Sequence, residues 1–503
     1  MKNRIKQLGK HSVIFGFGES LKRFVGFLLI PIYTRYLTPV DYGQLELLVL
    51  TSAILYIIVS QGIGTAFFRS YVFVEKELKS SVNNLISTAY YYIFCSALVV
   101  SLLLFVFSKQ YNIFLFGDNK ATELYIKIIA ITLLLSVIQL IPFQVLRARK
   151  EPIKFITVSL IGFLVQVSLN ILFVTVFRLG IKGILIANAI AGCFTAVITF
   201  LIVKKYLTFK LSTIILKDLI WFGLPLILSS LSFHIMQMSD RFLLQKLSST
   251  HEVGLYSIGL RFANILNIML ISPFRIAWGP FSFETAAKTE AKATFRKITN
   301  YFFLILCFFG MMVIVWSPSV IKIVTGAQFW DADQVILPLV YANICNGMLL
   351  IFVFGLYLVK KTKIIALIVT IGAVVNIGLN ILVIPKYGML GAAFVSLFSF
   401  VVINLLFYIF SQKYYFIPFD KARLLTILFI SIVTSCLSLY QAPNYLMDNL
   451  FRLSLMVLFG ISLYVFKVFE ASEISYVKRS FAELRKNKGI INKVRYAYNN
   501  FKN

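Results

Sequence analysis

Apolar blocks of about 20 residues, the length of a helix that crosses a hydrocarbon layer about 30 Å thick, recur along the whole chain. This pattern constrains the fold more than any other feature. The composition agrees with it, because 59% of the 503 residues are hydrophobic and only 14% are charged. A soluble protein averages about 25% charged residues. The sequence therefore predicts an all-α polytopic membrane protein and excludes soluble enzymes and nucleic-acid-binding domains.

We predict fourteen transmembrane helices joined by connections too short to hold a separate domain. Their expected ranges are 12–37, 43–66, 83–107, 121–146, 153–177, 181–203, 217–240, 254–278, 299–324, 335–358, 362–384, 388–411, 421–441 and 447–468. The chain has 5 cysteines, all in apolar stretches, and none forms a CxxC pair. The sequence therefore predicts neither a disulfide framework nor a bound metal.

The distribution of basic residues predicts the orientation. If the N-terminus lies in the cytoplasm, 34 of the 49 Lys and Arg residues fall on the cytoplasmic side, 11 on the opposite side and 4 within spans. Cytoplasmic loops of membrane proteins carry such an excess. Both termini are thus expected inside, and most of the net charge of +29 is explained without a polyanionic partner.

An internal repeat relates the two halves of the chain. The positions matched at an offset of 210 are Lys150 and Lys360, Gly162 and Gly372, Gln166 and Asn376, and the LNIL runs at 169–172 and 379–382. A weaker match, at an offset of 211, relates the run at 41–43 to that at 252–254. LNIL alone is a generic packing signal, but the shared offset indicates a duplicated unit of six helices. Since six is even, both copies cross the membrane in the same direction.

The predicted architecture is two parallel six-helix lobes around a central cavity, with two further helices. The lobes are 1–205 and 206–413, helices 13 and 14 lie in 414–469, and a basic cytoplasmic tail occupies 470–503. In the tail, four apolar residues fall on one helical face among Lys and Arg, which indicates an amphipathic helix on the anionic inner leaflet. A solvated helical tail is the alternative. The apolar residues are Ile474, Val477, Phe481 and Leu484.

Three charges lie inside the first span: Glu19, Lys22 and Arg23. Facing lipid, they would together cost roughly 8–10 kcal/mol by simple addition. Their spacing places all three on one helical face. We expect that face, with its net positive charge, to line a polar cavity that binds an anionic head group. The alternative is that they form ion pairs, such as Glu19 with Arg23, that hold helices in register.

Two arginines in the eighth span extend this prediction. Arg261 and Arg275 are 14 residues apart, about four helical turns, and so lie on nearly one face. Arg275 is close enough to the cytoplasmic end to extend its guanidinium to the interface. Both are candidates for the same cationic cavity, and ion pairing is again the alternative.

A second candidate site binds a coupling ion. Asp240 and Arg241 end the seventh span, and an adjacent pair at a helix end is most often interfacial. The sharper hypothesis combines Asp240 with Asn376 and Asn380 in the eleventh span, whose oxygen atoms could bind Na⁺. His234 could instead carry a proton, since histidine titrates near neutral pH, although a packed, hydrogen-bonded histidine is the more common case.

The sequence lacks the motifs of catalysis. There is no GxxxxGK[ST] run for ATP and no recognisable nucleophile or paired-carboxylate arrangement. Asp331 and Asp333 resemble half a metal site, but an exposed loop is the better interpretation. A secondary transporter without a cofactor is therefore predicted, with Na⁺ or H⁺ as its coupling ion. An integral-membrane polymerase or acyltransferase would need a large outer loop in place of a six-helix repeat.

The run LLIPIYTRYLTPVDYG at 28–43 resembles the start of the bacterial oligosaccharide flippases, the Wzx-type polysaccharide biosynthesis proteins of the multidrug/oligosaccharidyl-lipid/polysaccharide exporter superfamily. The segments at 240–256 and 379–391 resemble the second half of the same family. The resemblance implies two six-helix lobes that form a V-shaped cavity, plus two C-terminal helices.

The resemblance also implies an activity. An oligosaccharide repeat unit linked by pyrophosphate to undecaprenol would pass from the inner to the outer leaflet of the bacterial cytoplasmic (inner) membrane by alternating access. It would supply O-antigen, capsule or exopolysaccharide synthesis, with the polymerase machinery as a further partner. A multidrug exporter of the same superfamily is the alternative, but a cationic first span disfavours cationic drugs.

Overall fold

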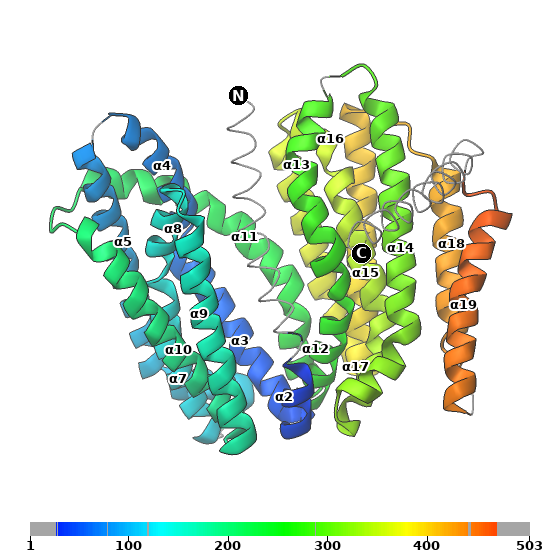
Figure 1. The fold of residues 1–503 in the computed structure, drawn as a ribbon, viewed down its shortest axis with the longest axis horizontal. Helices are drawn as coiled ribbons and strands as arrows, with labels where there is room; N and C mark the ends of the chain where they lie inside the picture. Colours follow the sequence, from blue (N-terminus) through cyan, green and yellow to red (C-terminus); the bar gives the residue numbers. More distant parts are fainter. Residues whose placement is uncertain are drawn as a thin grey trace, which may run out of the picture. The chain divides into compact units, whose positions relative to one another are not determined.

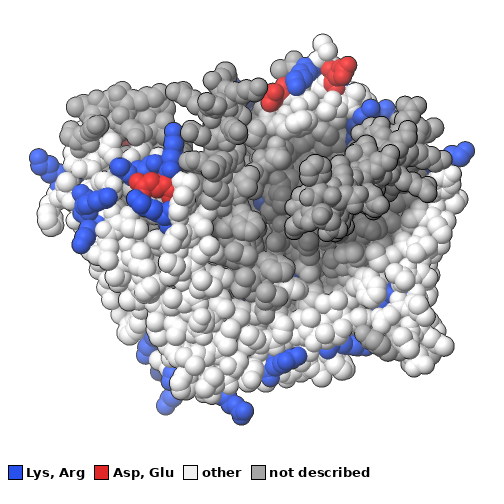
Figure 2. Space-filling view, viewed as in Figure 1, with Lys and Arg blue, Asp and Glu red and all other residues white. Residues whose placement is uncertain are grey.

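The computed structural model of the chain describes residues 27, 29–77, 79–117, 120–286, 288–440 and 444–469. Within these residues the regular elements are helices, and there is no strand (Figure 1). Ten of the described helical segments are long and apolar enough to cross a membrane. On the face shown in Figure 2, Lys and Arg lie mainly toward the upper and lower margins, and the coloured surface between them is mostly uncharged. The all-α membrane fold is confirmed, and the number of fourteen spans stays a prediction.

The described helices divide into two compact units. The first contains α2 (Ile30–Tyr36), α3 (Pro39–Ser60), α4 (Ile63–Glu77), α5 (Lys79–Val106), α6 (Ser108–Phe116), α7 (Lys120–Val137), α8 (Leu140–Ala148), α9 (Pro152–Ile171), α10 (Gly180–Val203), α11 (Thr213–Leu247), α12 (Thr250–Ala263), α13 (Ser272–Ala286), α15 (Ile336–Phe352), α16 (Phe354–Leu358) and α17 (Thr362–Tyr414). It also holds the π-helices η1 (Leu172–Val176) and η3 (Asn267–Ile271) and the 3₁₀-helices η2 (Lys204–Tyr206) and η4 (Ala327–Val335). The second unit contains most of α14 (Ala291–Val324), α18 (Lys421–Leu437) and α19 (Tyr445–Val465).

The repeat seen in the sequence has a counterpart in the backbone. Lys150 and Lys360 both adopt left-handed conformations, with φ of 57° and 56°. Such values are uncommon for residues other than glycine. The later pair Gly180 and Gly388 has φ of 55° and 53°, and Gly388 breaks α17 into two helical stretches. Two separate parts of the chain, at the α9–α10 connection and in α17, therefore share the same unusual backbone conformations in the same order. The boundaries predicted for the lobes stay a prediction.

Helices α3 and α12 begin in the same way. The Thr38 hydroxyl accepts a hydrogen bond from the Asp41 N–H at 3.1 Å. The Ser249 hydroxyl accepts one from the Glu252 N–H at 3.2 Å. Each cap satisfies an amide that the first helical turn leaves without a partner, which is typically worth about 1 kcal/mol. The caps fix where the two helices start relative to the glycines that follow.

A reciprocal contact joins α3 to α12. A Cβ atom added to Gly43 would lie 2.1 Å from the Thr250 carbonyl oxygen. One added to Gly254 would lie 2.0 Å from the Pro39 carbonyl oxygen. The repeat matches Gly43 with Gly254, and Pro39 and Thr250 are the first residues of their helices. Each helix thus packs its glycine against the start of the other, so close that neither position accepts a side chain without movement.

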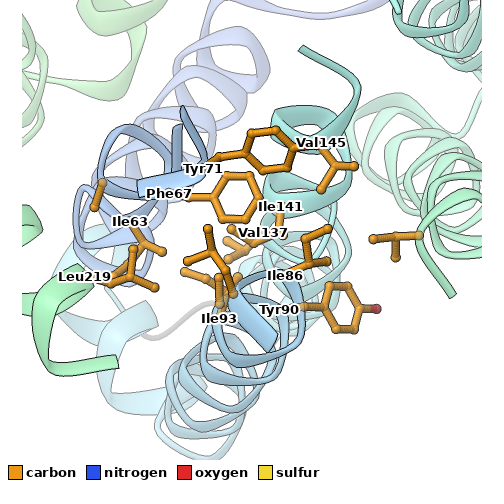
Figure 3. Packing of buried hydrophobic residues seen from close by; sticks show 14 of the residues in the cluster. Ile63, Phe67, Tyr71, Ile86, Tyr90, Ile93, Val137, Ile141, Val145 and Leu219 are labelled. Atoms are coloured by element: carbon orange, nitrogen blue, oxygen red, sulfur yellow. The ribbon is translucent and has the colours of Figure 1, made fainter. Parts of the chain in front are cut away.

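Helix α11 links the two predicted lobes. Near its start, Leu219 is buried in the apolar cluster of α4, α5, α7 and α8, where Phe67, Ile86 and Ile141 are fully buried (Figure 3). Its later turns pack against α17. The sequence assigned this span to the second lobe, whereas the structure shows that its ends pack on different lobes.

The second unit holds a buried arginine. Arg452 on α19 is 1% exposed. Its Nε lies 2.6 Å from Asp448 Oδ2, and its other end donates to the Val315 carbonyl oxygen on α14. A charged side chain inside a membrane helix is tolerated when it is paired in this way. Arg452 therefore connects α19 to α14.

Candidate functional site

Two salt bridges join the first lobe to the second. Glu46 on α3 places Oε1 2.9 Å from the Arg241 guanidinium on α11 and Oε2 3.1 Å from that of Arg261 on α12. The Arg241 guanidinium also donates to the Gln237 carbonyl oxygen at 2.7 Å. One carboxylate therefore bridges two arginines about one turn after the reciprocal glycine contact, since Glu46 follows Gly43 by three residues.

The three charged side chains differ in exposure. The side chains of Glu46 and Arg241 are 11% and 8% exposed, whereas that of Arg261 is 39% exposed. Arg261 also lies over the ring of Tyr42, 5.5 Å from its centroid, a geometry that attracts a cation. Removing one partner of a buried pair leaves an uncompensated charge. The buried Arg241 guanidinium therefore needs Glu46 as its partner, whereas part of the Arg261 side chain remains accessible to solvent or a ligand.

Next to Arg241, Asp240 is the centre of a polar cluster. Asp240 accepts hydrogen bonds from Asn380 Nδ2 at 2.7 Å, from the Tyr256 hydroxyl at 2.8 Å and from the Ser396 hydroxyl. Asn380 Nδ2 also lies 3.2 Å from Asn376 Oδ1. Each of these five residues is less than 10% exposed. The structure thus brings together Asp240, Asn376 and Asn380, the three residues predicted as a coupling-ion site, and adds a tyrosine and a serine.

The cluster offers oxygen ligands. Asn380 Oδ1 is buried and has no hydrogen-bond partner among the described residues. Carboxylate, amide and hydroxyl oxygens are the ligands that hard cations prefer. Turning the Asn380 amide over would direct Oδ1 instead of Nδ2 toward Asp240, a change that leaves the shape of the side chain unaltered. The donor set fits a monovalent cation held between Asp240 and the two asparagines.

A cavity of about 140 Å³ adjoins this cluster. It lies between α11, α12, η3, α15 and α17, and Asp240, Arg241 and Tyr256 form part of its wall. A larger cavity of about 490 Å³ lies between α3, α7 and α11, where His234 and Met238 face Tyr56 and Ser136. Polar side chains therefore reach both sides of α11.

The cationic cavity is only partly described. Glu19, Lys22 and Arg23 lie outside the described residues, as does the tail at 470–503. Arg261 is ion-paired, as the alternative interpretation held, yet partly exposed. Arg275 is an exposed residue of α13. The cationic cavity stays a prediction that these positions neither confirm nor contradict.

One expectation for the acidic residues was wrong, and a second was confirmed in part. The pair Asp240 and Arg241, expected at an interface with water, is 3% and 7% exposed and lies six residues before the end of α11. Asp331 and Asp333 were expected in an exposed loop; Asp331 is exposed and Asp333 partly buried, and both lie in the 3₁₀-helix η4. Among the described residues no group of three His, Cys, Asp or Glu side chains could bind a metal ion.

The sequence analysis did not identify Glu46 as a site residue, although its charge inside a predicted span was a signal. It is a carboxylate inside the predicted span 43–66, and a charge in a membrane helix indicates a partner or a function. Its partners Arg241 and Arg261 are 195 and 215 residues away. The charge could have been noticed, but its pairing required the structure.

Comparisons with known proteins support a transporter fold. The profile of a family described as "Polysaccharide biosynthesis protein" matches residues 32–334. The fold is similar to that of the lipid II flippase MurJ in an inward closed conformation, with a TM-score of 0.72 and 14% identity over 91% of this chain and 100% of that one. No curated protein sequence matches the chain significantly.

Multidrug transporters share the fold as well. An inward-facing MATE family transporter of the MOP superfamily matches with a TM-score of 0.61 and 14% identity over 78% of this chain and 94% of that one. A mutant of the Vibrio cholerae MATE transporter VcmN matches with a TM-score of 0.57 and 17% identity over 81% and 96% of the two chains. At such identities these structures define the fold alone.

Proposed function

The chain belongs to the polysaccharide biosynthesis protein family, and we propose that it is a flippase for undecaprenyl-pyrophosphate-linked oligosaccharide repeat units. It moves them from the inner to the outer leaflet of the cytoplasmic membrane, where a polymerase joins them into O-antigen, capsule or exopolysaccharide. Both termini lie in the cytoplasm. The isoprenoid tail stays in lipid, while the charged head group crosses between the lobes.

The observation that carries this proposal is the position of the Asp240 cluster beside the salt bridges that join the lobes. Asp240 and Arg241 are consecutive residues of α11. Asp240 contacts Asn380 and Ser396 of α17, and Arg241 contacts Glu46 of α3. A cation bound at Asp240 therefore changes the charge immediately beside the inter-lobe contact. Such an arrangement couples ion binding to the separation of the lobes.

Substrate recognition is assigned to the partly exposed cations. Arg261 keeps an accessible face beside Glu46, and we place the pyrophosphate there. Further positive charge comes from Lys22, Arg23 and Arg275. The negative charge of Glu19 partly neutralises it. A multidrug exporter would favour a free carboxylate for a cationic drug, whereas Glu46 and Asp240 are both engaged by hydrogen bonds.

Translocation in proteoliposomes tests the proposal. A fluorescent undecaprenyl-pyrophosphate oligosaccharide is incorporated, and its appearance in the outer leaflet is followed in Na⁺ or in choline buffer and at two pH values. We expect transport that depends on one of the two ions and is lost in Asp240→Asn. Asp331→Asn, which removes an exposed carboxylate of η4, is the matched control. Absence of translocation together with efflux of cationic drugs would establish the multidrug alternative.

A further inference from the structure

Five amide side chains surround the 140 Å³ cavity in the second lobe. Asn343 and Asn346 of α15 line it and are 7% and 6% exposed. Gln237 of α11 and Asn264 and Asn267, at the end of α12 and the start of η3, are half-exposed at its mouth. An uncharged amide buried in a membrane protein is costly unless it is hydrogen-bonded. So many amides around one cavity indicate that the cavity holds a polar group.

Several of these amides have hydrogen-bonding capacity to spare. Asn343 donates to the Leu339 carbonyl oxygen of its own helix, and Asn267 accepts from Ser272. The side chains of Gln237, Asn264 and Asn346 make no hydrogen bond to another described residue. Each amide offers two donor hydrogens and a carbonyl oxygen. The cavity is therefore lined by groups that can both donate and accept.

The charged groups in the cavity wall favour an uncharged ligand. The two ionic groups at the wall are Asp240, which three hydrogen bonds engage, and Arg241, which Glu46 neutralises. A phosphate would need a free cation, and a second metal ion would need a free carboxylate. Hydroxyl groups donate and accept at once, as the amides do. Tyr256 and Phe400 add aromatic surface to the same wall.

The position of the cavity relative to Arg261 is equally informative. Arg261, Asn264 and Asn267 follow one another at intervals of three residues and so share one side of the helix. About one helical turn, roughly 5 Å, separates each from the next. A head group whose pyrophosphate lies at Arg261 would place its first sugar at the mouth of the cavity. The π-helix η3 begins at Asn267, and such irregular turns often occur at functional sites.

We propose that this cavity is a sugar subsite, in which the amides of α11, α12, η3 and α15 bind the hydroxyl groups of one uncharged sugar of the translocated head group. At about 30 Å³ per water molecule, the cavity holds about five waters, which suits the polar edge of a single sugar ring. The inference rests on the proposed function. It follows that this subsite discriminates between different sugar repeat units, whereas the pyrophosphate site at Arg261 does not.

Binding of defined lipids to the purified full-length protein in nanodiscs tests the inference. The probes are bare undecaprenyl pyrophosphate and the same lipid carrying glucose, N-acetylglucosamine or N-acetylgalactosamine. We expect at least one sugar to increase the affinity about 10-fold, because its hydroxyl groups would form hydrogen bonds that the bare lipid cannot form. In the variant Asn264→Leu/Asn346→Leu that increase should vanish, while affinity for the bare lipid is unchanged.

A matched control separates the subsite from general packing. Asn404→Leu removes another buried amide of the second lobe, one that bonds the Cys345 and Phe400 carbonyl oxygens and does not line the cavity. It should keep the sugar preference. The inference is overturned if no sugar improves binding in the wild type, if the preference survives in the double variant, or if the double variant alters only the dependence on Na⁺. If no lipid binds at all, the proposed function fails with it.

Discussion

Replacing Glu46 with glutamine should weaken the closed contact between the lobes. The variant Glu46→Gln keeps the shape of the side chain but leaves Arg241 positively charged with its side chain 8% exposed. Breaking a buried ion pair from one side typically costs about 3–5 kcal/mol. Arg261 adds little, because its 39% exposed side chain can be solvated. A cost of about 3 kcal/mol corresponds to a shift of about 100-fold in the equilibrium between closed and open contacts.

The matching double variant identifies the cause. Glu46→Gln/Arg241→Gln removes both charges of the buried pair, so the one ion that loses its partner is Arg261, which is 39% exposed and can be solvated, and most of the closed population should return. If the single and double variants open the contact equally, unpaired charge is not the cause. Our account of the site would then be wrong.

Spin labels at the starts of α3 and α12 measure this equilibrium. Val40→Cys and His251→Cys place the labels on exposed positions beside the reciprocal contact. Serine replaces the five native cysteines, which are Cys95, Cys193, Cys307, Cys345 and Cys436. Double electron–electron resonance in nanodiscs should show one short distance in the parent protein and a second, longer one in Glu46→Gln. An unchanged distribution in a folded, monodisperse Glu46→Gln sample would refute the reasoning.

Three further predictions concern other positions. Gly43→Ala or Gly254→Ala should lengthen the same label distance, because the new Cβ would lie 2.1 or 2.0 Å from a carbonyl oxygen; an unaltered distance would contradict the close packing. If Na⁺ is the coupling ion, rising NaCl should raise the Tm of the purified protein relative to choline chloride, and Asp240→Asn should abolish that increase. Lys22→Ala/Arg23→Ala should abolish surface polysaccharide in a flippase-null strain at normal expression, and full activity would remove these residues from the site.

The sequence predicted the features that depend on local pattern. The apolar spans follow from composition, and the repeat follows from matched residues. Lys150 and Lys360, matched by offset alone, share the same unusual backbone angles. Asp240, Asn376 and Asn380 were grouped by chemistry, and they lie in contact. Periodicity and residue type carry this information without knowledge of the packing.

The features that the sequence did not predict depend on distant contacts. A run of apolar residues cannot show that α11 packs its start on one lobe and its end on the other. The pairing of Glu46 with two arginines depends on how α3 meets α11 and α12. Asp240 was expected at a helix end, where an adjacent charged pair is usually exposed to solvent, because the sequence does not show which helices pack around it. Whether a polar residue is buried depends on the helices that pack against it, which can be distant in the sequence.

The reciprocal glycine contact has the form that two identical subunits make about a two-fold axis, with each copy presenting the same patch to the other. The two matched halves of the chain therefore meet at this contact as two copies of a dimer would, although their side chains differ nearby. At an offset of 211, Ser257 stands where the first half has Glu46, and Tyr256 stands where it has Leu45. One half thus carries the carboxylate that pairs with both arginines, and the other carries the tyrosine hydroxyl that donates to Asp240. Under the proposed function, a cation bound at Asp240 in the second half would thus act on a contact that both halves share.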